Sequence, residues 1–342
     1  MLVPNMLQAR SLRSLSLGAT LLLSIPMTSF AQRDQPLTLE LPLNCRFGGN
    51  CFIQQYFDHD GSTAAKDFRC GPMSYDGHDG TDMRLPTMAE QKKGVEIVAA
   101  AAGVVRGTRD GMDDISVRIA GPDSVKGREC GNGVVVTHPG GWETQYCHME
   151  KGSVRVRNGQ SVAAGTVLGR VGISGDAEFP HLHFSVRHGT EKVDPFAWGA
   201  APEACSGGKS LWSDKAAAQL AYHSPDIANT GFASMPVNMD DVESGRAGES
   251  KPAADSPNLI AFVRAIGLRK GDVQILTLRG PGGAALASVQ VPPLDSNKAQ
   301  WLQFVGKKRT TDAWLRGAYE AQYEVKRDGV SALIRRFEFD LR

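Results

Sequence analysis

The sequence has almost no net charge, because 38 Lys and Arg residues balance 37 Asp and Glu residues to a formal charge of +1. No nucleic acid or other polyanionic partner is therefore indicated. Aromatic residues are also few, at 7%, and they form no stripe that predicts a platform for sugar rings. The hydrophobic fraction of 41% and the charged fraction of 22% are nevertheless those of a folded globular protein.

The sequence contains no apolar run that is long enough to span a bilayer. The strongest run, residues 15–25, follows the basic residues Arg10 and Arg13. Residues 29–31, Ser-Phe-Ala, then fit a small-x-small cleavage site. This order is typical of a secretory signal peptide, with a buried N-terminal helix as the alternative. We therefore predict a signal peptide over residues 1–31 and an exported chain, periplasmic or extracellular, with no membrane segment after signal removal.

The six cysteines include no Cys-x-x-Cys pair, so a zinc–thiolate site or a reactive thiol is not favoured. In an exported chain, six cysteines instead predict disulfides. The sequence alone does not choose among their pairings. Spacing favours a short local loop, a bridge between two strand-like runs and a remaining pair, namely Cys45–Cys51, Cys130–Cys147 and Cys70–Cys205.

Helical patterns are scarce, and short apolar runs separated by Gly turns predict strands. Between residues 71 and 198 these runs predict an antiparallel all-β domain. The expected strands are 94–100, 103–107, 115–119, 133–138, 143–148, 153–157, 166–171 and 181–187.

The same alternation returns near the C-terminus, after a stretch rich in Asp, Ser, Pro and Gly. Six regularly spaced runs there predict an immunoglobulin-like β-sandwich, so the fold class is all-β throughout. We expect a lead-in over 32–70, a catalytic domain over 71–200, a linker with a short helix over 201–257, and the sandwich over 258–342. The sandwich is interpreted as a targeting, substrate-positioning or packing module, or as a simple cap.

Histidine and aspartate side chains suited to a metal lie in two separate segments. His78 and Asp82 flank Gly80, which lets the backbone curl so that both side chains meet at one point. An imidazole and a carboxylate are good zinc ligands. In the second segment, His181 and His183 are two apart on an expected strand and therefore project to one face. One of them can bind the metal while the other lies beside the bound water.

A further histidine, His148, ends the expected strand 143–148. By strand alternation, Tyr146 and His148 should share a face. Each cluster taken alone also fits a histidine without a catalytic role. The remaining histidines add no ligand or base to the set, and we assign no role to His59, His138, His188 and His223.

Taken together, the order His-x-Gly-x-Asp, Tyr-x-His and Pro-His-Leu-His-Phe resembles the LytM and lysostaphin-type zinc endopeptidases, which cut peptide bonds in bacterial cell-wall peptidoglycan. The resemblance covers roughly residues 71–198. It departs from the family where Met149 replaces the more frequent Leu, and where Cys130 and Cys147 are added. The lead-in and the C-terminal region lie outside it.

This resemblance implies that His78, Asp82 and His183 bind one zinc ion per chain, and that His148 and His181 are catalytic. It also implies a zinc metalloendopeptidase that hydrolyses peptidoglycan cross-links through a zinc-activated water. Two alternatives stay open: a catalytically silent activator of another wall hydrolase, and a metallopeptidase that acts on secreted protein. The expected partners are peptidoglycan peptides, and the sequence indicates neither the oligomeric state nor the scissile bond.

Overall fold

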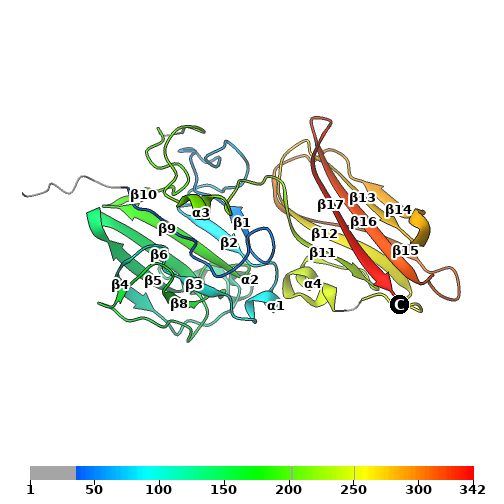
Figure 1. Ribbon diagram of the computed structural model, residues 1–342, viewed down its shortest axis with the longest axis horizontal. Coiled ribbons are helices and arrows are strands. Elements are labelled where there is room, and N and C mark those ends of the chain that lie inside the picture. Colours follow the sequence, from blue (N-terminus) through cyan, green and yellow to red (C-terminus); the bar gives the residue numbers. More distant parts are fainter. Residues whose placement is uncertain (1–35, 202, 250) are drawn as a thin grey trace, which may run out of the picture. The chain divides into compact units, whose positions relative to one another are not determined.

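A central antiparallel sheet organises the first part of the structure (Figure 1). The computed structural model describes residues 36–201, 203–249 and 251–342, and in these residues the sheet has eight strands in the order β1-β2-β9-β6-β5-β4-β7, with β10 beside β9. Its strands are β1 Phe52–Gln55, β2 Thr81–Arg84, β4 Gly103–Arg109, β5 Asn132–His138, β6 Trp142–Met149, β7 Ser161–Val162, β9 His181–His188 and β10 Glu191–Val193. The predicted signal peptide over 1–31 lies outside the described residues.

One face of this sheet forms the hydrophobic core. On β9, Leu182, Phe184 and Val186 alternate toward that face and are fully buried. Tyr146 of β6 packs on Phe184, with ring centroids 5.3 Å apart. A two-stranded sheet of β3 Glu96–Val98 and β8 Val167–Arg170 adds to the core. The alternate residues of β9, which include His181 and His183, consequently lie on the opposite face.

The lead-in is part of this fold. β1 comes from the predicted lead-in and pairs antiparallel with β2, while Leu39 and Leu43 are buried in the same core. Apolar residues of the lead-in thus complete the core of the first sheet.

Two of the expected strands are wrong. Residues 115–119 overlap the helix α2 Val117–Ala120, because the Ser116 side chain accepts a hydrogen bond from the Arg118 N–H and starts a helical turn. Residues 153–157 run beside β8, where the Arg155 N–H donates to the Leu168 carbonyl, but they are too irregular to form a strand. The apolar residues of both segments had suggested strands.

Two antiparallel sheets form the C-terminal part, in the orders β11-β12-β15 and β14-β13-β16-β17. One hydrophobic cluster joins them, so they make a sandwich with an immunoglobulin-like strand arrangement. Near the start of β16, the Tyr319 hydroxyl donates to the Leu315 carbonyl, as in the tyrosine corner of such sandwiches. The strands are β11 Asp226–Ala233, β12 Asn258–Leu268, β13 Val273–Arg279, β14 Ala285–Gln290, β15 Lys298–Lys308, β16 Gly317–Arg327 and β17 Val330–Leu341.

The first strand of the sandwich corrects the expected linker. β11 lies within 201–257 and pairs along β12. The polar residues Asn229 and Thr230 and the following Gly231 interrupt its apolar pattern, which is why no strand was expected there. The short helix expected within the linker is a single turn, α3 Asp214–Ala217.

The remaining helices are short. They are α1 Met88–Gln91, α4 Met239–Ser244 and the 3₁₀ turns Pro122–Val125, Pro139–Gly141, Arg246–Gly248 and Pro281–Gly283. Among the described residues, no helix has the length and apolar character needed to cross a membrane. The three disulfides join the expected partners, Cys45–Cys51, Cys70–Cys205 and Cys130–Cys147.

Candidate metal centre

Three side chains from two distant segments of the sequence converge on one point of the sheet face. His78 Nε2 lies 3.2 Å from Asp82 Oδ1 and 3.2 Å from His183 Nδ1, and the last two atoms are 2.9 Å apart. Asp82 and His183 are directly opposite on the paired strands β2 and β9, and His78 comes from the loop before β2. The structure thus brings the three residues expected as ligands together, and they form a group that could hold a metal ion.

A glycine in the first segment permits this approach. A Cβ atom built on Gly80 would lie 2.7 Å from His183 Nε2 and 2.8 Å from the Phe184 carbonyl oxygen. Any side chain at this position would therefore push β9 away from the loop that carries His78. The sequence suggested that Gly80 allows His78 and Asp82 to approach each other. The structure shows that Gly80 also allows this loop to pack closely against β9.

The hydrogen bonds of the two imidazoles leave the converging nitrogens free to bind a cation. His78 Nδ1 lies 2.6 Å from the Tyr56 carbonyl, to which it donates, so Nε2 carries the lone pair. His183 Nε2 lies 3.1 Å from Asp79 Oδ1 and donates to it, so Nδ1 carries the lone pair when the ring is neutral. Such outer contacts are typical of metal-binding histidines, since they set the tautomer. Two imidazoles and one carboxylate are a donor set that fits zinc with an open position.

Charge and burial at this site favour a bound cation. Burial opposes ionisation of Asp82, yet the charges of His78 and His181 hold the pKa of Asp82 well below its usual range. Burial favours a neutral His183, but hydrogen bonds to Asp79 and Asp82 raise the pKa of His183 to about 9. A proton on His183 thus takes the place of a cation between two carboxylates.

The two histidines expected to be catalytic lie beside this group. The ring of His148 is centred 4.6 Å from that of His181 and 6.0 Å from that of His183. His148 Nδ1 is 2.8 Å from the Ser174 carbonyl, and His181 Nδ1 is 2.9 Å from the Phe179 carbonyl. Both rings donate through Nδ1, which leaves each Nε2 as an acceptor.

Burial disfavours the protonated form of both imidazoles. Burial, and then the charges of His181 and His183, lower the pKa of His148 well below its usual value. Burial also lowers the pKa of His181, against the opposing charge of Asp82. Both shifts favour the neutral form of the ring. His181 Nε2 lies 3.6 Å from Asp82 Oδ1.

The expectation that Tyr146 and His148 share a face is wrong. Asn132 pairs with Met149 and Val134 with Tyr146, so β6 holds one extra residue at this point, which is a β-bulge. At the bulge, His148 has a φ of 60°. The extra residue reverses the alternation, so that Tyr146 lies in the core while His148 faces the histidines of β9.

Sequence reasoning missed three residues that contact the site. Tyr75 stacks its ring on His78 at a centroid distance of 4.4 Å, and it lines the cleft with His148 and His183. Asp79 pairs with Lys192 of β10 as well as with His183. The position of Asp79 inside the His-x-Gly-x-Asp segment was a usable signal, whereas the distant Lys192 offered none.

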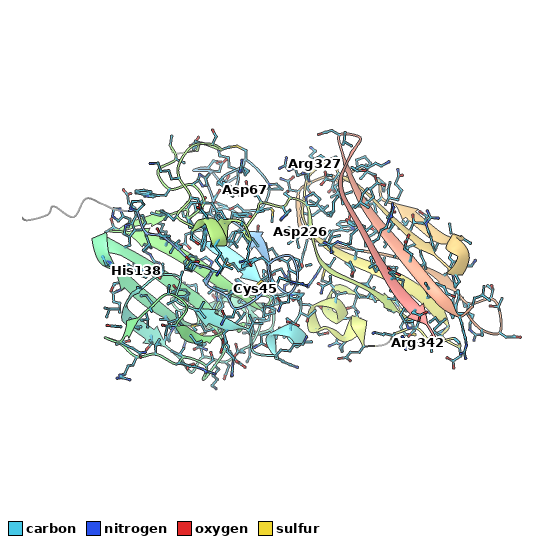
Figure 2. The ribbon with its side chains drawn as sticks, viewed as in Figure 1. Cys45, Asp67, His138, Asp226, Arg327 and Arg342 are labelled. Carbon is cyan, nitrogen blue, oxygen red and sulfur yellow. A yellow bond between two sulfur atoms is a disulfide. The ribbon has the colours of Figure 1, made fainter. Side chains whose placement is uncertain are left out.

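The histidines to which no role was assigned make contacts elsewhere. His138 lies at the end of β5 (Figure 2). It bonds to the Ala102 carbonyl and to the Thr144 hydroxyl. His59 pairs with Asp194.

Residues 76–195 match the family model described as Peptidase family M23. The domain that contains this site is therefore an M23 peptidase domain. The chain is 43% identical over 58 residues to the cell division protein DipM of Caulobacter vibrioides, across 17% of this chain and 9% of that protein. It is 44% identical over 61 residues to the protease LasA of Pseudomonas aeruginosa, across 16% and 14%.

A longer match is to the DD-carboxypeptidase/endopeptidase Mpg of Neisseria meningitidis serogroup B, 32% identical over 102 residues, across 30% of this chain and 21% of that protein. The chain thus matches less than a quarter of the length of each of these relatives. Among solved structures, the catalytic domain of the prophage-encoded M23 protein EnpA from Enterococcus faecalis is 26% identical, with a TM-score of 0.29, and the match covers 42% of this chain and 98% of that one.

Replacing Asp79 with asparagine is expected to weaken metal binding by about 10- to 100-fold, because Asp79 orients His183 and increases its basicity. The affinity would be measured by competition with a chromophoric chelator. Asp76→Asn is the matched control, since Asp76 is exposed in the same loop. Equal affinities for the two variants would show that Asp79 does not support the site.

Lower pH is expected to weaken metal binding. Since the pKa of His183 is about 9 without a metal, the ring is protonated at pH 7, and a cation must displace that proton. The apparent Kd should therefore rise about tenfold from pH 8 to pH 7. Titration calorimetry in buffers of different ionisation enthalpy would count about one proton released per ion, and no release at pH 7 would contradict the expectation.

Proposed function

We propose that this chain is an exported zinc metalloendopeptidase that hydrolyses peptide bonds in peptidoglycan cross-links. One observation carries the proposal: His78 Nε2, Asp82 Oδ1 and His183 Nδ1 converge to within 3.2 Å beside the imidazoles of His148 and His181. The M23 match over residues 76–195 supports peptide-bond hydrolysis. The peptidoglycan substrate is supported by the resemblance of the histidine segments to LytM and lysostaphin-type enzymes.

His78, Asp82 and His183 would hold the zinc ion. A zinc ion with three protein ligands keeps one open position, polarises a carbonyl and lowers the pKa of a coordinated water from about 15.7 to about 7.

The protein's own groups supply the proton transfers. We assign to His148 and His181 the two tasks of accepting a proton from the attacking water and donating one to the oxyanion or the leaving amine. Each Nε2 is free for this work, because each Nδ1 is bonded to a backbone carbonyl. These carbonyls also fix the ring orientation, so little reorganisation is needed when the proton moves. Such acid–base catalysis contributes roughly 10²–10⁴-fold.

A zymogram on purified cell walls tests the proposal. We expect a clear band that a chelator abolishes and that added zinc restores. If the protein leaves walls intact but cleaves a Gly-rich secreted protein, the metallopeptidase with a protein substrate is correct. If it binds zinc and cleaves neither substrate, the catalytically silent activator is correct.

A further inference from the structure

A buried arginine connects the metal-site face to the C-terminal sandwich. Arg84 follows Asp82 by two residues on β2, so both side chains lie on the same face, and Arg84 lies opposite His181 in the pairing with β9. The side chain of Arg84 has no exposed area. A fully buried guanidinium beside the site is costly unless it is paired.

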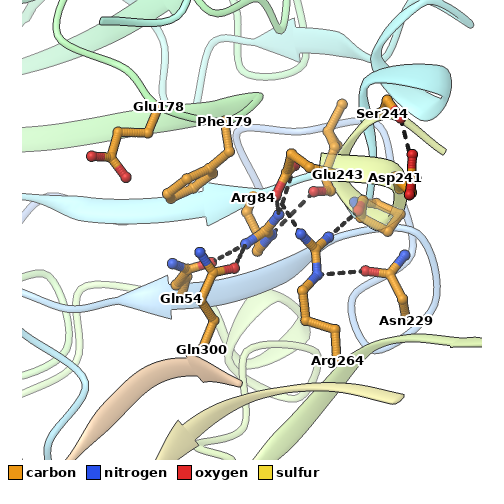
Figure 3. Close-up of polar contacts among 12 residues, drawn as sticks. Gln54, Arg84, Glu178, Phe179, Asn229, Asp241, Glu243, Ser244, Arg264 and Gln300 are labelled. Carbon is orange, nitrogen blue, oxygen red and sulfur yellow. Dashed lines mark hydrogen bonds and ion pairs between the residues drawn. The ribbon is translucent and has the colours of Figure 1, made fainter. Parts of the chain in front are cut away.

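Its charge partner comes from the segment that precedes the second strand of the sandwich. Both carboxylate oxygens of Glu243, on α4, lie 3.0 Å from Arg84 Nη2 (Figure 3). Glu243 also pairs with Arg264 of β12, which donates to the Pro86 carbonyl just after β2. Gln54 of β1 accepts a further bond from Arg84. One carboxylate thus pairs with two buried cations that come from the two parts of the fold.

Arg84 reaches the catalytic histidines through Phe179. The guanidinium carbon lies 4.5 Å from the centre of the Phe179 ring, as in a cation–π contact. The Phe179 carbonyl accepts from His181 Nδ1 at 2.9 Å, and the two rings are centred 4.7 Å apart. The contacts therefore run without interruption from Glu243 through Arg84 and Phe179 to His181.

From this chain of contacts we infer that Glu243 is a positioning residue for His181, and that the C-terminal part of the chain is thereby required for full activity. The inference rests on the proposed peptidase function. Without the carboxylate, Arg84 and Arg264 are two unpaired buried cations that repel one another. Arg84 then withdraws from Phe179, and the carbonyl that fixes the His181 ring moves. Glu243 lies outside the ligand set, so metal binding is unaffected.

The test uses the full-length exported chain with the substitutions Glu243→Gln and Glu243→Asp. We expect Glu243→Gln to keep one zinc per chain and a near wild-type KM, and to lower kcat by up to about 100-fold, as a displaced catalytic group does. Glu243→Asp, which restores the charge, should recover most of that loss. Asp241→Asn is the matched control, because Asp241 lies on the same helix and pairs with the exposed Arg246.

A second readout does not depend on hydrolysis. In NMR spectra of the zinc-loaded protein, the ring resonances of His181 should shift in Glu243→Gln and stay unchanged in Asp241→Asn. Wild-type kcat and unshifted His181 resonances in a folded Glu243→Gln protein would overturn the inference. If Glu243→Gln does not fold, Glu243→Asp and Phe179→Leu provide the same comparison. If the wild type cleaves no wall, the proposed function fails, while the His181 resonances still decide the positioning role.

Discussion

Replacing His183 with alanine is expected to remove both the bound metal and all measurable hydrolysis. His183 Nδ1 is one of the three converging atoms, and the variant keeps only His78 and Asp82 at the site. Two ligands do not hold zinc against dilution as three do, and without the ion no group remains to polarise the scissile carbonyl. This is the largest effect that we expect from a single substitution.

The measurement is zinc per chain after dialysis, together with the rate of wall hydrolysis. His188→Ala is the matched control, because His188 is also on β9 but contacts the Gly140 carbonyl and the Trp142 ring instead of the site. We expect the control to keep one zinc ion and the wild-type rate. A His183→Ala protein that retains one ion per chain would exclude the proposed ligand set.

Replacing His148 with alanine is expected to leave the zinc content unchanged and to lower kcat by roughly 10²–10⁴-fold. His148 lies beside the ligands without belonging to the converging group, and its ring presents Nε2 as a proton acceptor because Nδ1 donates to the Ser174 carbonyl. His181→Ala should behave in the same way. The two variants therefore separate acid–base catalysis from metal binding, which His183→Ala cannot do.

The backbone at His148 calls for a second variant. Its φ of 60° is in the left-handed region, which asparagine adopts more readily than alanine. His148→Asn removes the proton acceptor with less backbone strain, so both variants should lose activity to a similar extent while thermal unfolding reports any difference in stability. If either variant hydrolyses walls at the wild-type rate, His148 has no catalytic role.

The site was predictable to the extent that its geometry is local. His181 and His183 share a face because side chains alternate strictly along a strand. His78 and Asp82 can meet because Gly80 lies between them in the sequence and lets the backbone curl. The position of His148 required tertiary information. The bulge that turns His148 toward β9 depends on the pairing of β6 with β5, and strand alternation alone had placed it beside Tyr146.

The same limit applies to the fold. Regular alternation predicted most strands of both β domains, but β11 was missed because Asn229, Thr230 and Gly231 interrupt its pattern. β11 is stabilised by its pairing with the eleven-residue strand β12. This pairing compensates for the weak preference of the β11 residues for a strand. The opposite error occurred at residues 115–119, where a strand was predicted but is not formed. The Ser116 cap favours a helical turn over the strand that the apolar residues suggested.

The sequence by itself determined the all-β class and supplied the five histidine and aspartate residues of the candidate site, because both depend on residue type and short-range spacing. It favoured one set of disulfide pairs, and the structure selected it. Only the tertiary structure decided which nitrogen of each imidazole faces the cluster, how His148 joins it, and that Glu243 and Arg84 link it to the sandwich. These features arise from contacts made in the folded chain, some of them between segments more than a hundred residues apart, such as Arg84 with Glu243. Local patterns carry no information about such contacts, because burial and pairing of charges are properties of the packed molecule.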